Sequence, residues 1–153
     1  MTHEIAVFAA GCFWGVEESF RTLAGVVSTA VGYTGGTLDK PSYRDVCSGR
    51  TGHAEAVRIG FDPGLTSYRE LLESFWQCHD PTTLNRQGLD IGSQYRSAIF
   101  YADERQKQTA EESLSRQRAS GRYRQSIVTE ISPLAAFWLA EPEHQQYLAR
   151  RRT

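Results

Sequence analysis

The stretch that decides the fold is EIAVFAAGCFWG, residues 4–15, because a strand and a helix meet in it. Residues 4–10 form a nearly continuous apolar run, which predicts a strand in the middle of a sheet. Gly11 interrupts this run, and apolar residues then recur at helical spacing over residues 14–21. The junction therefore predicts a layered domain that combines sheet and helices.

Strand and helix patterns alternate along the rest of the chain. Strands are predicted at 26–33, 53–61 and 96–101, with an edge strand at 125–131. Helices are predicted after two N-terminal caps, Ser67 with Glu70 and Asp103 with Gln106, and over residues 141–150. The glycine-rich stretch 32–52 is long enough to predict an irregular functional loop.

Composition narrows the class of protein. The chain has 153 residues, 40% of them hydrophobic, which suits a single domain over residues 1–153. The formal net charge of -1 and the absence of a long apolar run predict neither nucleic-acid nor membrane binding. The first residues do not form a signal-peptide pattern, so we expect the protein in the cytoplasm. We also expect it to be a monomer. Three cysteines, an odd number, favour reduced or redox-active thiols over a disulfide framework.

Cys12 is the first candidate for chemistry, because it lies where the strand ends and the helix begins. A thiol there faces unpaired backbone N–H groups and the positive end of the helix dipole, and both favour the reactive thiolate. Gly11 and Gly15 leave room for a substrate. Phe13 and Trp14 predict an apolar wall for a methyl group or a positively charged sulfur. The alternative is a buried cysteine that packs as a small hydrophobe among core aromatics.

Glu55 is the second candidate, because it alternates in phase with apolar residues of the predicted strand 53–61. If that face packs on the core, desolvation raises the pKa of the carboxyl and keeps it protonated, as a general acid requires. The alternative is a glutamate that reaches water or pairs with Arg58 or Arg96. His53 shares the face, and we expect it to be structural.

Seven motifs occur in order along nearly the whole chain: GCFWG at 11–15, GYTGG at 32–36, YRDVCSG at 43–49, TGHAEAV at 51–57, HDP at 79–81, GSQYRS at 92–97 and EHQQYL at 143–148. Together they resemble the peptide methionine sulfoxide reductase A family, which is specific for the S epimer of the sulfoxide. The resemblance implies an α+β fold, a two-layer sandwich around a mixed sheet. It also implies a ferredoxin-like core with added helices and long irregular segments.

The resemblance implies a reaction at four residues. Cys12 is expected to be the nucleophile, and Glu55 the proton donor to the sulfoxide oxygen. Tyr43 and Tyr95 are expected to donate hydrogen bonds to that oxygen; the alternative is packing with a surface hydroxyl. A sulfoxide is a poor electrophile until its oxygen is protonated, so acid and hydroxyl donors must meet the oxygen while the thiolate attacks the sulfur. Methionine leaves, and Cys12 remains as a sulfenic acid.

The same resemblance implies a substrate site without a cofactor or a metal. Phe13 and Trp14 hold the methyl group of the oxidised methionine, which is either free or part of a protein. Asp90 lies near the thiol and hydrogen-bonds the substrate backbone. At the neighbouring position this chain has Leu89, where the family usually has a polar asparagine.

The sequence departs from many family members at its C-terminus. Those members continue into a glycine-rich tail with resolving cysteines, whereas this sequence stops at Thr153, which indicates a variant without the tail or a truncated chain. We therefore expect thioredoxin, glutaredoxin or a small thiol to reduce the Cys12 sulfenic acid. Cys47 is an alternative, internal resolving thiol. Cys78 is expected to be a packing residue.

Three other interpretations of the sequence remain open. The first is a hydrolase that pairs Cys12 with His53 or His79 and with Asp80 or Asp90. The second is a metal-binding module made of Cys47, Cys78, His53 and His79, although no pair of these has the close spacing of a zinc knuckle. The third is a catalytically silent relative that binds oxidised methionine, for which an acid and a nucleophile would have no use.

Overall fold

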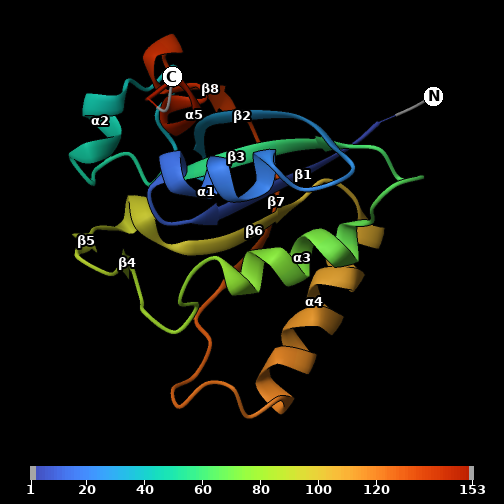
Figure 1. The fold of residues 1–153 in the computed structure, drawn as a ribbon. Coiled ribbons are helices and arrows are strands. Elements are labelled where there is room, and N and C mark those ends of the chain that lie inside the picture. Colours follow the sequence, from blue (N-terminus) through green and yellow to red (C-terminus); the bar gives the residue numbers. More distant parts are fainter. Residues whose placement is uncertain (1–2, 152–153) are drawn as a thin grey trace.

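The computed structural model describes residues 3–151 and contains a six-stranded sheet (Figure 1). The strands of this sheet are β1 (Glu4–Ala10), β2 (Val26–Thr34), β3 (Ala54–Phe61), β6 (Ser97–Tyr101), β7 (Glu130–Pro133) and β8 (Trp138–Leu139). A separate hairpin consists of β4 (Arg86–Gln87) and β5 (Asp90–Ile91). The helices are α1 (Phe13–Arg21), α2 (Tyr43–Cys47), α3 (Tyr68–Gln77), α4 (Glu104–Ala119) and α5 (Tyr147–Arg151). Two 3-10 turns are η1 (Ser93–Tyr95) and η2 (Pro142–His144).

The order of the strands confirms the predicted fold class. The sheet runs β7-β6-β1-β3-β2-β8, and its four central strands follow the chain as β1-α1-β2-β3-α3-β6. β1 is antiparallel to both of its neighbours, β3 and β6, which is the arrangement of a ferredoxin-like core. β7 pairs with β6 in parallel, so the sheet is mixed. The fold is α+β, as predicted.

β1 is central because its side chains are buried on both faces of the sheet. Phe8 faces the helices, and its ring lies 5.6 Å from Phe20 of α1 and 5.0 Å from Phe75 of α3. Val7 and Ala9 face the opposite side, in a smaller cluster against which Leu134 and Phe137 pack. A continuous apolar run is thus the pattern expected of this strand.

The loop 32–52 is less irregular than predicted, because it contains the short helix α2. Ser42 caps this helix: its hydroxyl accepts the Asp45 N–H, and the Asp45 carboxylate accepts the Ser42 N–H. This reciprocal pair is a capping box. The two predicted caps are also confirmed in part, since Ser67 accepts the N–H of Glu70 and Asp103 accepts that of Gln106.

Two other predicted elements were wrong in extent. The predicted edge strand at 125–131 is β7 at Glu130–Pro133, because Val128 instead donates its N–H to the Pro81 carbonyl. The predicted helix at 141–150 is split into η2 and α5. Gln145 pairs with both backbone groups of Val31, and Gln146, at φ 47°, donates its N–H to a carboxylate on α1. These bonds between distant segments replace the helical ladder.

The β4–β5 hairpin was not predicted. It stands out from the body of the molecule below the start of α1 (Figure 1). Gln87 anchors it, because its side-chain amide donates to the Asp80 carbonyl and accepts the Asp80 N–H, each at 2.8 Å. Within residues 3–151, no helix is both long enough and apolar enough to cross a membrane.

Candidate active site

Cys12 lies at the N-cap of α1, at the predicted junction of strand and helix. Its carbonyl accepts the Val16 N–H at 3.3 Å, which begins the helix. Gly11 makes the turn with φ 105°, a conformation that L side chains rarely adopt. A Cβ at Gly11 would also lie 2.9 Å from the side chain of Gln87 in the hairpin. The glycine therefore brings the hairpin close to the thiol.

The pKa of Cys12 is opposite to the sequence-based expectation. Burial, together with the charges of Glu55 and Asp90, raises the pKa of the thiol to about 11. The backbone N–H groups of Trp14 and Gly15 lower it, in the direction predicted for a helix N-terminus, but they do not outweigh the burial. Cys12 is therefore a thiol, not a thiolate, near neutral pH in the absence of substrate.

Glu55 lies on β3 and is 1% exposed, as the alternation of the strand predicts. Its Oε1 accepts the Phe13 N–H at 3.1 Å, which links the carboxyl to the first turn of α1. Its Oε2 is buried without a hydrogen-bond partner. Burial raises the pKa of Glu55 to about 7, the Phe13 N–H lowers it, and the charge of Asp90 raises it. The carboxyl can thus both hold and release a proton near neutrality.

The two predicted hydroxyl donors lie on different short elements. Tyr43 is the first residue of α2, and burial, followed by Cys47 at the end of the same helix and by the charge of Glu55, raises the pKa of its hydroxyl. Tyr95 ends η1, and burial raises the pKa of its hydroxyl to about 12, with contributions from the charges of Glu55, Cys47, Asp90 and Cys12. The charge of Glu55 thus raises the pKa of each of the other three predicted catalytic side chains, which the structure brings around this carboxyl.

Asp90 reaches the site from the hairpin. It lies on β5, and its charge raises the pKa values of Cys12, Glu55 and Tyr95. Leu89, beside it, is 98% exposed at the tip of the hairpin. Asp90 is thus the member of the predicted set that stands at the rim of the site rather than in its interior.

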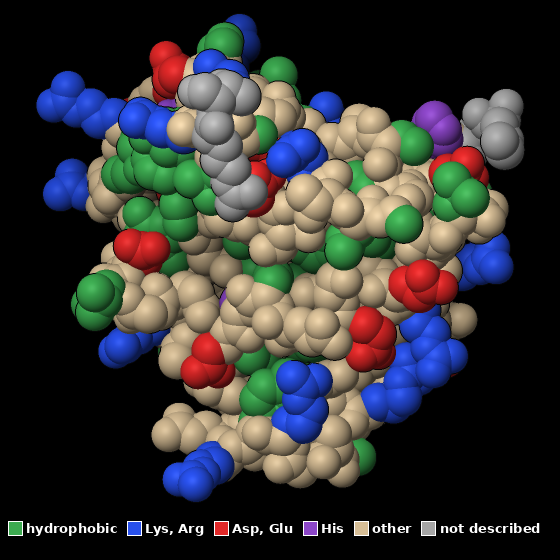
Figure 2. All heavy atoms as spheres, in the orientation of Figure 1, with side chains coloured by type: hydrophobic (Ala, Val, Ile, Leu, Met, Phe, Trp, Pro, Cys, Tyr) green, Lys and Arg blue, Asp and Glu red, His purple; other side chains and the backbone are tan. Residues whose placement is uncertain are grey.

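Phe13 and Trp14 form the predicted aromatic wall together with residues far along the chain. Trp14 stacks on Tyr147 with ring centroids 3.9 Å apart, and its indole N–H donates to Nδ1 of His144 at 3.0 Å. Phe13 is fully buried, and its ring lies 6.3 Å from that of Tyr43. Figure 2 shows hydrophobic side chains gathered in the area between α2 and the start of α1. This wall lies next to the thiol.

The functional side chains that the sequence analysis missed come mainly from the segment around η2. Glu141 accepts a hydrogen bond from the Tyr33 hydroxyl at 2.8 Å and another from the Tyr43 N–H at 2.9 Å. The His144 ring lies 4.5 Å from that of Tyr43. The motif EHQQYL pointed to this segment, but the sequence alone does not tell which of its residues face the site.

Cys47 and Cys78 differ in their exposure to solvent, and His53 is held by hydrogen bonds. Cys47 is exposed and adjoins Tyr43, whereas Cys78 is partly buried at the end of α3, where its thiol donates to the Phe75 carbonyl. His53 has both ring nitrogens in hydrogen bonds, with the N–H of Gly36 and the carbonyl of Leu38, so it is structural, as expected.

His79 also has both ring nitrogens engaged, with the Phe75 carbonyl and the Ser97 hydroxyl. A hydrolase would need one of these histidines free to act on Cys12. Neither is free, which removes the support for that reading. Within residues 3–151, no three His, Cys, Asp or Glu side chains are grouped so as to hold a metal ion.

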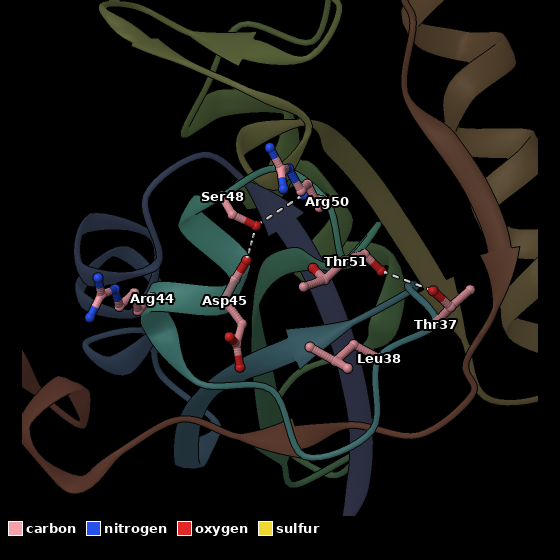
Figure 3. A pocket seen from close by; sticks show the side chains of 7 residues that line it. All are labelled: Thr37, Leu38, Arg44, Asp45, Ser48, Arg50 and Thr51. Atoms are coloured by element: carbon pink, nitrogen blue, oxygen red, sulfur yellow. Dashed lines mark hydrogen bonds between the residues drawn. The ribbon is translucent and has the colours of Figure 1, made fainter.

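A hollow of about 580 Å³ lies on the outer side of α2 and is formed by Thr37, Leu38, Arg44, Asp45, Ser48, Arg50 and Thr51 (Figure 3). None of the predicted site residues lines it. Arg44 and Arg50 point away from each other in Figure 3 rather than toward a shared ligand position. The hollow is therefore separate from the thiol site and adds no group to it.

A thiol beside a buried, protonatable carboxyl, at the ends of the central strands of a ferredoxin-like sheet, defines a class of enzymes that combine a cysteine with an acid. Comparison with known proteins identifies which one. The family profile described as "Peptide methionine sulfoxide reductase" matches residues 4–153. The chain belongs to the peptide methionine sulfoxide reductase family, type MsrA, and it is a methionine sulfoxide reductase.

Individual relatives are similar in sequence to almost the whole chain. MsrA of Methanoculleus marisnigri is 57% identical over 97% of this chain and 90% of its own length. MsrA of Geobacter sulfurreducens is 56% identical over 97% of this chain and 91% of its own length. In structure, the chain is similar to reduced Mxr1 from Saccharomyces cerevisiae, with a TM-score of 0.90 and 34% identity over 99% of this chain and 87% of that one. Mxr1 in complex with Trx2 also matches, with a TM-score of 0.65 and 26% identity over 95% of this chain and 84% of that one.

Proposed function

We propose that this enzyme reduces the S epimer of methionine sulfoxide, free or in proteins, with Cys12 as the nucleophile and Glu55 as the proton donor. The observation that carries the proposal is the Glu55 carboxyl. One of its oxygens is bound by the Phe13 N–H, the other is buried without a partner, and its pKa is about 7. Such a carboxyl can present its proton to a sulfoxide oxygen beside the thiol.

The first step moves an oxygen atom from methionine to cysteine. Glu55 gives its proton to the sulfoxide oxygen, while the hydroxyls of Tyr43 and Tyr95 donate hydrogen bonds to it. The sulfur of Cys12 attacks the sulfoxide sulfur, and the thiol proton passes to the Glu55 carboxylate. The oxygen is then transferred to Cys12, the bond between oxygen and the methionine sulfur breaks, and the thioether leaves. Two electrons pass from the cysteine sulfur to the methionine sulfur, so the balance needs no cofactor.

The high pKa of Cys12 fits this order of events. The thiol keeps its proton until a substrate is bound, and the charge of Glu55 is one of the causes. When Glu55 is protonated, that repulsion is absent, and the thiolate forms more easily. Protonation of Glu55 therefore supplies the acid and, at the same time, removes a charge that opposes formation of the Cys12 thiolate.

Selection of one epimer requires the three substituents of the sulfur to meet different surroundings. The oxygen is directed to Glu55 and the tyrosines, and the methyl group to Phe13 and Trp14. The remaining chain extends toward the rim, where Asp90 bonds the substrate backbone. Because Cys12 attacks from a fixed direction, exchange of oxygen and methyl group would bring an apolar group to the acid. The family resemblance identifies the accepted epimer as S.

An external thiol completes the cycle. Its sulfur displaces hydroxide from the Cys12 sulfenic acid, which yields a mixed disulfide and water, and a second thiol releases Cys12. Thioredoxin is the favoured reductant, since the related Mxr1 has been solved in complex with Trx2; glutaredoxin or a small thiol would act in the same way. Cys47, which is exposed on α2, is the alternative, internal thiol.

The proposal is tested by a dithiothreitol-driven assay on the separate S and R epimers, with the wild type beside Cys12→Ser. We expect turnover of the S epimer only, and none with Cys12→Ser. Preference for the R epimer, or full activity of Cys12→Ser, would contradict the assignment. Mass spectrometry after a single turnover tests the reductant: a stable Cys12–Cys47 disulfide would replace the external route by an internal one.

A further inference from the structure

Glu141 connects two parts of the site without lying among the reacting groups. Its Oε1 accepts the hydroxyl proton of Tyr33 at 2.8 Å, and its Oε2 accepts the backbone N–H of Tyr43 at 2.9 Å. Tyr33 lies directly opposite Glu55 in the pairing of β2 with β3. Glu141 thus ties the strand pair that carries the acid to the first residue of the helix that carries a hydroxyl donor.

α2 is held in place mainly through Tyr43, whose ring packs on those of Phe13, Trp14 and His144 and whose backbone N–H is bound by Glu141. It has five residues, and only Val46 among them is buried. A helix this short is not stable by itself, so contacts with other segments decide where it lies. The position of the Tyr43 backbone limits the space that its hydroxyl can reach. The bond from that backbone N–H to Glu141 therefore restrains the position of the hydroxyl.

The charge of Glu141 is compatible with this role and not with proton transfer. Burial raises the pKa of Glu141, but the hydrogen bonds from Tyr43, from its own backbone and from Tyr33 lower it by more, so that the net shift is downward. Glu141 is therefore an anion in the pH range where Glu55 titrates. Each of its oxygens already accepts a hydrogen bond from another residue of the protein, one from the Tyr33 hydroxyl and one from the Tyr43 N–H.

We infer that Glu141 is a positioning residue for the reduction: through the backbone of α2 it holds the Tyr43 hydroxyl where the sulfoxide oxygen binds. The inference rests on the proposed function, because it concerns the geometry of the same reaction. Loss of the tie displaces a donor that acts on the transition state. The consequence is a lower kcat with a small change in KM.

The test compares four variants on the S sulfoxide with dithiothreitol as reductant. Glu141→Ala is expected to lower kcat by about 10–100-fold, since small displacements of oriented groups have effects of this size. Glu141→Gln is expected to keep most of the activity, because its amide oxygen still accepts the Tyr43 N–H and its amide nitrogen donates to the Tyr33 hydroxyl. Tyr33→Phe is expected to lower kcat by only a few-fold, because it removes one of the two bonds. Glu143→Ala is the matched control: it is an exposed carboxylate of the same turn, η2, and should behave as the wild type.

The decisive comparison repeats Glu141→Ala and Tyr33→Phe in a Tyr43→Phe background. If Glu141 acts through the Tyr43 hydroxyl, neither change lowers kcat further once that hydroxyl is absent. Additive losses would overturn the inference, and so would a Glu141→Gln enzyme as impaired as Glu141→Ala. Thermal unfolding of each variant identifies any that fail to fold, and in that case Glu141→Gln and Tyr33→Phe decide. An inactive wild type would instead contradict the proposed function.

Discussion

Two halves of the site are built in different ways. Cys12 follows β1 and caps α1, and Glu55 lies on β3, which pairs with β1 in the centre of the sheet. Tyr43, Tyr95 and Asp90 belong to α2, η1 and β5, which have five, three and two residues. The ladder and the core hold the first half, whereas single hydrogen bonds and ring contacts hold the second. The difference teaches that the two residues proposed to react are fixed by the sheet, while the groups proposed to surround the oxygen depend on a few contacts.

The largest expected effect comes from the first half. Glu55→Gln keeps the size of the side chain but has no acidic proton to donate. We expect kcat on the S sulfoxide to fall by about 10²–10⁴-fold, the usual contribution of a general acid. Steady-state kinetics with dithiothreitol measure it. Glu143→Gln removes a charge without touching the site and serves as the control; equal losses in both variants would contradict the role of Glu55.

The tyrosines of the second half should give smaller and overlapping effects. Two hydroxyls share one oxygen, so Tyr43→Phe or Tyr95→Phe alone is expected to lower kcat less than the about 10²–10³-fold that a sole donor provides. The double variant is expected to lose more than either single one. Single-turnover rates of sulfoxide reduction measure the three variants. Unchanged rates in the double variant would show that the oxygen binds elsewhere.

Burial of the acid also has a consequence for stability. The pKa of Glu55 is about 7 in the folded protein against 4.5 ordinarily, so the folded state holds a proton that the unfolded chain loses. Stability from this group is therefore fully present below about pH 4.5 and is lost as the pH rises through about 7. Glu55→Gln should be more stable than the wild type above that range, on the order of 1–3 kcal/mol. Urea unfolding at pH 4 and pH 8 measures the difference, and an equal difference at both would contradict it.

The smallest effect is expected at the rim. The charge of Asp90 raises the pKa of both Glu55 and Cys12. Because Glu55 must be protonated to act, kcat/KM should fall as the pH rises through its pKa. Asp90→Asn should move this fall to lower pH, and Glu55→Gln should remove it. A pH profile of kcat/KM measures both. A shift to higher pH in Asp90→Asn would contradict the electrostatic contact.

The sequence was most informative where the pattern of a single segment determines the structure. The apolar run of β1 and the alternation of β3 predicted a central strand and a buried Glu55, and both are confirmed. The break of the predicted terminal helix at Gln145 and Gln146 could not be predicted, because the bonds to Val31 and Glu17 that cause it join distant segments. Similarly, the helix terminus at Cys12 was visible in the sequence, but the burial that reverses its effect on the pKa was not.

The tie between Glu141 and Tyr43 also bears on the order in which the enzyme becomes active during synthesis. The bond spans 98 positions of the chain, and the bond of Trp14 to His144 spans 130. Contacts of such separation form late, because closing long loops must precede them. Residues 141–147 are synthesised well after the central strands, the last of which, β6, ends at Tyr101. The bonds to Tyr43 and Trp14 can therefore form only after this late segment has been made and has docked.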